Sequence, residues 1–385
     1  MAKHLDGLID NAKTISGEST RYIGVLDLDI EPEEVRKKGL PENVLAKAQD
    51  ECHNEGIAEV VAVDRDFISS NSDLLSRLAK GYMELRQAKE PEMTLDSARS
   101  YLIDNPAAYA AMLVKKGMLH GVIGGKYSNS GHFLGPVLRI MGNGKTVSAV
   151  GIVDYPESYG YDLLGVGDVA LNVNVGTGDR LEDVIVNSQE IFMRLLGVVN
   201  PRVALISSST GSYNPKSEAD KLIREWNEKY GNNHGEDVFG PCQADAALVP
   251  RVAMNKEGCP FTNRPADIHV YTELAGANSA YKYIEFLARA AEGIPNQMMD
   301  YVFGVLTRQE VQLTDECRSE LEGLRHMLDD GVKTIFLLPV WIQADDLSRG
   351  SDVYSTKATI AAQVVKSSLV PPNKFDYEFV RKLIT

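Results

Sequence analysis

Residues 333–341, KTIFLLPVW, form an apolar run without polar alternation, and residues 345–355, DDLSRGSDVYS, follow it with dense polar chemistry. A run of this kind predicts a β-strand that is buried on both faces, as in a parallel sheet. Open α/β sheets place their binding sites just beyond the carboxyl ends of such strands. The stretch therefore predicts an α/β fold and marks residues 345–355 as a candidate site.

The same order of strand and helix recurs along the chain. Five more apolar runs precede helical patterns, at residues 22–30, 58–64, 121–125, 202–209 and 266–274, and the run at 333–341 leads to a helical pattern at 356–369. Val- and Ile-rich strands that alternate with helices indicate parallel sheets covered by helices on both faces.

The length of 385 residues is large for one hydrophobic core and suits two domains. Residues 141–162 are rich in Gly, Tyr and turn residues, which favours a boundary there, and residues 295–331 resemble a helical hairpin between two α/β units. The predicted division has a domain I from residues 1–144 plus 332–385, which carries the 345–355 loop. A domain II covers residues 145–294, and residues 295–331 form a helical insertion.

The composition excludes some partners. A formal net charge of -14 argues against nucleic acid, whose phosphates require a basic face. No apolar run approaches the length of a membrane span, and residues 1–13 read as an amphipathic helix rather than a signal segment. Four widely spaced cysteines with no C-x-x-C pair favour reduced thiols. We expect a soluble, cytoplasmic protein that binds neither nucleic acid nor membrane.

Common cofactor motifs are missing from the sequence. No G-x-G-x-x-G follows a predicted strand, and GNGKT at 142–146 lacks the first glycine of a P-loop because Arg139 stands in its place. The seven histidines have no metal-ligand spacing. We therefore expect no metal and no permanently bound cofactor.

Two loops rich in Ser and Gly follow predicted strands and open helices. The first is GGKYSNSG at 124–131, with Lys126, Ser128 and Ser130, and the second is SSSTGSYNPK at 207–216, with Ser209, Thr210, Ser212 and Lys216. Backbone amides at such helix starts can hold an anion. Helix capping and serine turns explain each loop equally well when it is taken alone. With residues 345–355 they make three such loops, which favours a phosphate-rich ligand.

Arg349 is the residue of the 345–355 loop that helix capping does not explain. Ser351 is a good N-cap and Asp352 suits the first turn of the next helix, but a cation beside that positive helix end is misplaced. An anion between Arg349 and the helix would account for it. Arg86 lies late in a helix, where a cation suits the dipole, so a solvated side chain and a ligand contact both remain open.

The order of motifs resembles the phosphate acetyltransferase/phosphate butyryltransferase family. The matching segments run from ELRQAK to VIGG and continue with PRVALISSSTGS, GPCQADAALVPRVA, ADIHVYTELAGANSAYK and DDLSRG, at 84–125, 201–212, 240–253, 266–282 and 345–350. The resemblance implies two three-layer α/β/α domains of the isocitrate/isopropylmalate dehydrogenase type, a cleft between them, and a homodimer.

The resemblance also implies the reaction and its residues. The reaction converts an acyl-CoA and phosphate into an acyl phosphate and CoA, with coenzyme A as a substrate. Ser348 and Arg349 take the places that orient and stabilise the reacting acyl phosphate, and Arg86 takes the place of a coenzyme-contacting arginine. The segment after the second-domain strand matches at Asn278, Tyr281 and Lys282.

Two departures from the family pattern concern charged residues of the expected site. Gly135 stands where the family has an arginine, and Arg139 or Lys126 are the nearest replacements. The family's catalytic aspartate falls on Tyr354 or Ser355, which leaves Asp352 as the nearby carboxylate.

Three hypotheses follow from these departures. The first is a short-chain phosphate acyltransferase with an altered acyl or acceptor pocket, in which Ser348, Arg349 and Asp352 are the catalytic residues. The second is a catalytically impaired relative that binds acyl-CoA or serves as a complex subunit. The third, a decarboxylating dehydrogenase, would require a magnesium-binding aspartate cluster that the sequence does not offer.

Overall fold

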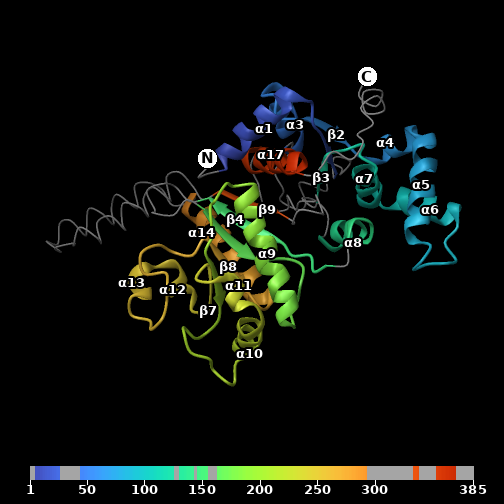
Figure 1. Cartoon of the computed structure of the whole chain (residues 1–385). Coiled ribbons are helices and arrows are strands. Elements are labelled where there is room, and N and C mark those ends of the chain that lie inside the picture. The colour runs from blue at the N-terminus through green and yellow to red at the C-terminus, as the bar shows by residue number, and fades with distance from the viewer. Residues whose placement is uncertain are drawn as a thin grey trace. The chain divides into compact units, whose positions relative to one another are not determined.

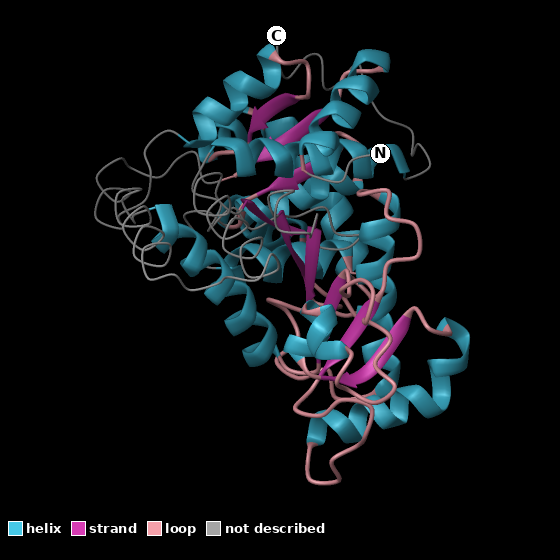
Figure 2. Cartoon of the chain, turned by 90° about the vertical axis from the view of Figure 1, so that its left-hand side faces the viewer, coloured by secondary structure: helices cyan, strands magenta, loops and turns pink. Residues whose placement is uncertain are grey.

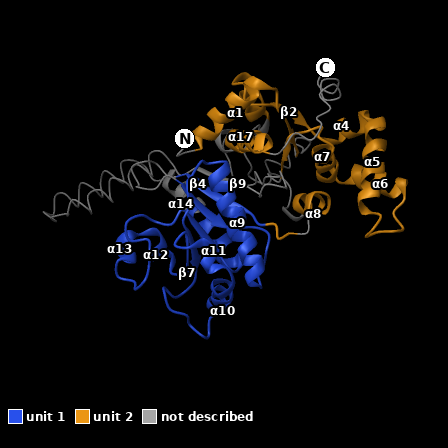
Figure 3. Ribbon diagram, in the orientation of Figure 1, with its two compact units in different colours: residues 1, 3, 148–334 blue, residues 2, 4–147, 335–385 orange. Residues whose placement is uncertain are grey.

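The computed structural model describes residues 5–26, 44–124, 130–142, 145–154, 163–292, 333–337 and 353–369. The chain forms two compact units, unit 1 from residues 148–334 and unit 2 from residues 4–147 and 335–385 (Figure 3). The sequence places its boundaries after residues 144 and 331, and the helical insertion at 295–331 lies outside the described residues.

Unit 2 contains a three-stranded sheet in the order β2-β1-β3. Its strands are β1 (Tyr22–Val25), β2 (Glu59–Ala62) and β3 (Gly121–Ile123). The central strand β1 is parallel to both neighbours, as the apolar runs predict. All four residues of β1 are buried, because β1 is the central strand and helices cover the sheet.

Three helices of unit 2 pack together although they come from the two ends of the chain (Figure 1). They are α1 (Asp6–Glu18), α3 (Val44–Asn54) and α17 (Val353–Leu369). Lys357 of α17 pairs with Glu55 at 2.8 Å and with Glu51 at 3.3 Å, and Lys13 of α1 pairs with Glu55 at 2.8 Å. These ion pairs fix α1 and α17 to α3 at the edge of a buried apolar contact.

The remaining helices of unit 2 are α4 (Arg65–Ser70), α5 (Ser72–Arg86), α6 (Leu95–Asp104), α7 (Pro106–Lys115) and α8 (Ser130–Met141). Helix α6 begins at a capping box in which Thr94 and Ser97 satisfy each other's backbone amides. Helix α7 is buried from Ala107 to Leu113, and its small alanines allow neighbouring helices to approach closely. The start of α8 and the end of α5 carry residues of the predicted site.

A six-stranded sheet in the order β7-β6-β8-β5-β4-β9 contains five strands of unit 1 and the strand β9, whose residues are divided between the two units at residue 334. The strands are β4 (Val150–Asp154), β5 (Leu163–Gly167), β6 (Val203–Ile206), β7 (Val238–Cys242), β8 (Ile268–Tyr271) and β9 (Lys333–Leu337). The pairs β5–β8, β6–β8 and β6–β7 are parallel. β4 and β5 are antiparallel, so the expectation of purely parallel sheets is wrong at this pair.

The helices of unit 1 are α9 (Gly178–Arg194), α10 (Glu218–Trp226), α11 (Asn232–His234), α12 (Ala244–Leu248), α13 (Pro250–Ala253) and α14 (Leu274–Glu292), with a π-helical turn at Asn227–Gly231. Figure 2 shows the strands in magenta among these cyan helices. The largest buried side chains of the unit are Phe192, Trp226 and Phe261. The unit is therefore a mixed α/β structure around an aromatic core.

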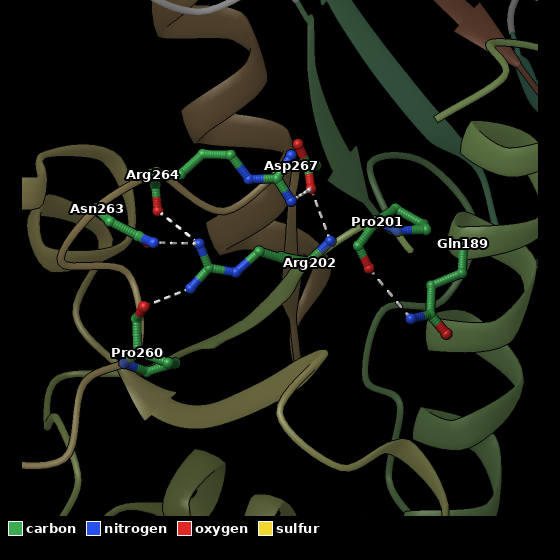
Figure 4. A network of polar contacts seen from close by, with 7 residues as sticks. All are labelled: Gln189, Pro201, Arg202, Pro260, Asn263, Arg264 and Asp267. Atoms are coloured by element: carbon green, nitrogen blue, oxygen red, sulfur yellow. Dashed lines mark hydrogen bonds and ion pairs between the residues drawn. The ribbon is translucent and has the colours of Figure 1, made fainter. Parts of the chain in front are cut away.

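Arg202 fixes the start of β6 to the loop that precedes β8 (Figure 4). Its guanidinium donates to the carbonyl oxygens of Pro260 and Arg264 and lies 4.8 Å from the centre of the Phe261 ring. Its backbone amide donates to Asp267 at 2.7 Å. This arginine is thus used for structure, since its donors are directed at the protein itself.

In the part of the chain that the structure describes, every helix is too short or too polar to cross a membrane.

Candidate functional site

The predicted site residues divide into those that the structure describes and those that it does not. Ser348, Arg349, Asp352, Lys126 and Ser128 lie outside the described residues. Ser130 is the first residue of α8. The geometry below therefore concerns the ends of α5 and α8, the loop after β6, and the start of α14.

Arg86, in the last turn of α5, shares one carboxylate with a second arginine. Its Nε and Nη2 atoms donate to Oε1 of Glu90 at 3.2 and 2.5 Å, and Arg139 of α8 donates to the same oxygen. The hydrogen bonds from Arg86, and then those from Arg139, hold the pKa of Glu90 below its ordinary value. We name Arg86, Glu90 and Arg139 the arginine cluster.

Two stacked tyrosines support the arginine cluster. The guanidinium of Arg139 lies 5.3 Å from the centre of the Tyr101 ring, and that ring stacks on Tyr82 at 5.0 Å with an interplanar angle of 6°. Burial, followed by the neighbouring Tyr101, raises the pKa of Tyr82 to about 12. Tyr82 is therefore neutral at physiological pH, and the Tyr101 ring holds Arg139 by a cation–π contact.

The loop after β6 is organised around the carboxylate of Asp220, which is 0% exposed. The hydroxyl of Ser209 donates to it at 2.6 Å and that of Ser217 at 3.3 Å, and the Ser207 hydroxyl and the Asn214 amide also donate to it. Burial alone would raise the pKa of Asp220, but these donors outweigh burial and hold the pKa below its ordinary value. Asp220 thus occupies the position that a bound anion would take among these donors.

Thr210 joins the same loop to the segment after β7. The backbone amide of Gln243 donates to its hydroxyl at 3.0 Å, and Lys256 donates to the side-chain oxygen of Gln243 at 2.7 Å. Gly211 has a φ of +71°, and a Cβ there would lie 2.5 Å from the carbonyl oxygen of Glu257, so the turn requires glycine. The loop is closed onto its neighbours, while the side chain of Ser212 is exposed.

The predicted residues of α14 have different surroundings. Asn278 donates to the carbonyl oxygen of Val169 at 2.9 Å, which attaches the helix to the segment that follows β5. Tyr281 is buried, with its ring where a Cβ on Gly151 would stand. Lys282 is exposed. Within this group Lys282 is the side chain that a ligand could reach most readily.

Sequence reasoning missed Asp168, a buried carboxylate directly after β5. It accepts hydrogen bonds from the backbone amides of Ala149, Ala170, Leu171 and Asn172 at 2.8 to 3.2 Å. Burial nevertheless outweighs these bonds and raises its pKa. Its position at a strand end, followed by a run of turn residues, was the available signal.

Glu90 and Asp220 were also missed, and the sequence offered a signal for each. Glu90 follows Arg86 at the i,i+4 spacing of a helical ion pair. Asp220 stands three residues after Ser217, which caps α10, as the acidic residue of a capping box does.

Parallel strands that alternate with helices, with a hydroxyl-rich loop beyond the end of β6, define an α/β protein. The model of the phosphate acetyl/butaryl transferase family matches residues 36–294, more than half of the chain. The chain belongs to this family, which confirms the resemblance drawn from the motif order. The matched residues end before Ser348 and Arg349.

Curated relatives agree with the family match. A phosphate acetyltransferase of Acetivibrio thermocellus is 31% identical over 265 residues, which cover 66% of this chain and 77% of the relative. A phosphate acetyltransferase of Thermoanaerobacterium thermosaccharolyticum is 29% identical over 264 residues, which cover 66% and 78%.

Two solved structures share the fold. A phosphotransacetylase from Streptococcus pyogenes aligns with a TM-score of 0.64 at 19% identity, over 94% of this chain and 98% of that chain. The EutD phosphotransacetylase from Staphylococcus aureus aligns with a TM-score of 0.61 at 19% identity, over 94% and 99%.

Proposed function

We propose that this protein is a phosphate acyltransferase, which converts an acyl-CoA and inorganic phosphate into an acyl phosphate and free CoA. Membership of the phosphate acetyl/butaryl transferase family carries this proposal. The arginine cluster agrees with it, because guanidinium groups are well suited to phosphoryl groups. A phosphate oxygen attacks the thioester carbonyl, the carbon–sulfur bond breaks, and CoA leaves as a thiol.

The catalytic roles in this proposal rest on residues 345–352. Ser348 and Arg349 orient the acyl phosphate and stabilise the charge that develops on its carbonyl oxygen. In the reverse reaction a base must deprotonate the CoA thiol, whose ordinary pKa of about 8.5 leaves it mostly protonated at neutral pH. Asp352 is the proposed base, since Tyr354 and Ser355 occupy the place of the family's aspartate.

The proposed binding roles follow the sequence motifs. Arg86 contacts the coenzyme, and Lys126, Ser128 and Ser130 form an anion-binding loop at the start of α8. Ser209, Thr210, Ser212, Asn278 and Lys282 are proposed as further contacts from unit 1. Among these, the exposed side chains of Ser212 and Lys282 are free to meet a ligand directly, whereas Ser209 would have to exchange its bond to Asp220.

The isocitrate/isopropylmalate dehydrogenase type of fold, the cytoplasmic location and the homodimer belong to the same proposal. A homodimer predicts a molar mass of twice that of the chain in sedimentation equilibrium. A monomeric mass would remove that part of the proposal.

A screen of acyl-CoA thioesters with phosphate, followed by the release of free thiol, tests the function. We expect thiol release with short acyl chains and a decline as the chain lengthens. Arg349→Ala should slow turnover by about 10²–10³-fold, the usual cost of losing one oxyanion donor. Arg194→Ala, which removes an exposed arginine paired with Glu190 on α9, is the matched control and should leave turnover unchanged. Saturable binding of CoA without any thiol release would contradict the proposal.

A further inference from the structure

The arginine cluster holds more positive than negative charge. Two guanidinium groups, on α5 and α8, both donate to one oxygen of Glu90. Arg86, Glu90 and Arg139 together therefore carry a net charge of +1. A phosphoryl group carries up to two negative charges and three acceptor oxygens, so it would balance both arginines better than a single carboxylate does.

Both arginines are held in place by the protein. The side chain of Arg86 is only 13% exposed, and a cation that has lost most of its water requires an anion nearby. Arg139 rests on the stacked pair of Tyr101 and Tyr82. Cations fixed in this way lose little conformational freedom when a ligand binds.

Solvent can reach the anion position. The side chains of Glu90 and Arg139 are 30% and 37% exposed, so an incoming anion can displace the carboxylate without opening the core. Glu90 also sits in the turn after α5, where its backbone amide bonds to Arg86 and its side chain can rotate toward solvent. The carboxylate is thus an exchangeable partner of the two arginines.

An ordinary helical ion pair offers a contrast. On α9, Arg194 and Glu190 form an i,i+4 pair at 2.8 Å, with side chains 47% and 25% exposed. That pair has one arginine for one carboxylate and is electrically balanced. Exposed pairs of this kind contribute little to stability and attract no further anion.

We propose that Glu90 occupies, in the free protein, the position of a phosphoryl group of coenzyme A, and that the ligand binds by displacing it. The inference rests on the proposed function, because the ligand it names is the substrate of that reaction. Arg139 then acts as a second phosphate-binding residue beside Arg86. Glu90 lowers the apparent affinity for CoA, since its pair with the arginines must open before the ligand can bind.

Calorimetric titration of coenzyme A into the wild type and two matched variants tests this proposal. Glu90→Gln should bind CoA about three- to tenfold more tightly, because the competing charge is gone while an amide oxygen can still accept hydrogen bonds. Glu190→Gln, which removes the carboxylate of the balanced pair, should bind CoA as the wild type does. Arg139→Ala should bind about tenfold more weakly.

The same variants give a kinetic readout that a structural role would not produce. Glu90→Gln should lower KM for CoA, as expected when a group that competes with the ligand is removed, and Glu190→Gln should leave KM unchanged. If Glu90→Gln fails to fold, Glu90→Asp, whose shorter side chain reaches the arginines poorly, should show the same gain. Titration of dephospho-CoA, which lacks the 3′-phosphate, identifies the phosphoryl group that replaces Glu90. If the diphosphate replaces it, Glu90→Gln also binds dephospho-CoA more tightly than the wild type does. If the 3′-phosphate replaces it, the two proteins bind dephospho-CoA equally.

Several results would overturn the proposal. One is a CoA affinity equal to or weaker than that of the wild type in folded Glu90→Gln and Glu90→Asp. Another is that these variants bind inorganic phosphate more tightly than the wild type but do not bind CoA more tightly. In either case wild-type thiol release would leave the acyltransferase function standing. A wild type that neither binds CoA nor releases thiol would remove both proposals together.

Discussion

The arginine cluster in unit 2 and the Asp220 loop in unit 1 use similar polar side chains for opposite purposes. In the first, two cations share one partly exposed carboxylate. In the second, one fully buried carboxylate takes hydrogen bonds from serine hydroxyls and a backbone amide. The difference teaches that a donor-rich loop is not by itself an anion site. Whether such a loop can bind an external anion depends on whether a carboxylate of the protein already accepts its hydrogen bonds, and on how deeply that carboxylate is buried.

The largest expected effect concerns the Asp220 loop, whose donors already have a carboxylate as their acceptor. Asp220→Ala should lower the free energy of unfolding by about 3–5 kcal/mol, because several buried donors lose their acceptor at once. Urea unfolding measures this loss. Asp179→Ala, which removes an exposed carboxylate paired with Lys229 at the start of α9, should cost far less. Equal losses in the two variants would show that Asp220 does not organise its loop.

A second buried polar group in unit 1 should make stability depend on pH. His269 of β8 is buried, its Nε2 has no hydrogen-bond partner among the described residues, and burial lowers its pKa to about 4. The unfolded chain takes up a proton as the pH falls below the ordinary histidine pKa of 6.5, while the folded chain stays neutral until about 4. The contribution of the neutral His269 to the free energy of unfolding is therefore fully present above pH 6.5 and is lost as the pH falls toward 4.

The loss attributable to His269 should reach about 3 kcal/mol. His269→Leu should flatten the pH dependence of the unfolding free energy between those values, as urea titrations at several pH values would measure. Some slope should persist, because burial also lowers the pKa of His120 to about 4. An unchanged slope in His269→Leu would count against a neutral buried imidazole.

Substitutions in the arginine cluster should change ligand binding more than they change the stability of the fold. Arg86→Ala should raise KM for CoA about tenfold, the equivalent of one charge-assisted hydrogen bond, and change stability by less than about 1 kcal/mol. Steady-state kinetics and thermal unfolding of the same preparation test both parts. A loss of stability without a change in KM would place Arg86 with the structural arginines such as Arg202.

The smallest expected effect tests the loop around Asp220 as a ligand contact. Ser212 has an exposed side chain on this loop. A single neutral hydrogen bond to a ligand is worth about 1 kcal/mol, so Ser212→Ala should raise KM for CoA or phosphate by no more than about fivefold. No change in either KM would leave the loop with a purely structural role.

The sequence analysis predicted β1, β2, β3, β6, β8 and β9 from their apolar runs and missed β4, β5 and β7. β4 lies inside the turn-rich stretch at 141–162, and β5 follows it directly without having been predicted as a strand. Gly151, Gly165 and Gly167 weaken the strand pattern of both. The structure explains these glycines by contacts from elsewhere in the chain. The ring of Tyr281 fills the space beside Gly151, and the ring of Phe192 fills the space beside Gly165.

β7 was missed for a related reason. Its sequence VFGPC contains Gly240 and Pro241, which argue against a central strand. The strand lies at one end of the sheet order, where a proline need not donate to a further neighbour. Edge position depends on the tertiary fold and cannot be read from a local pattern.

Family membership was within reach of the sequence because several motifs occur in one order, and the family match confirms it. The hydrogen-bond and ion-pair partners of the predicted site residues could not be predicted from the sequence. Arg86 could be selected from its motif, but its partnership with Arg139 depends on how α5 and α8 pack. The serine loop was predicted as a phosphate site from its composition, but the bonds of Ser207 and Ser209 to Asp220 could not be predicted, because they depend on how the first turn of α10 packs on the loop.

The packing of α17 against α1 and α3 has a consequence for biosynthesis. Residues near the start of the chain cannot complete their hydrophobic core until residues 353–369 have left the ribosome. Unit 1 is synthesised entirely between these two segments and can fold first, because domains generally fold as units during translation. Unit 2 is thus completed only after α17 has been synthesised, although most of its residues precede unit 1 in the chain.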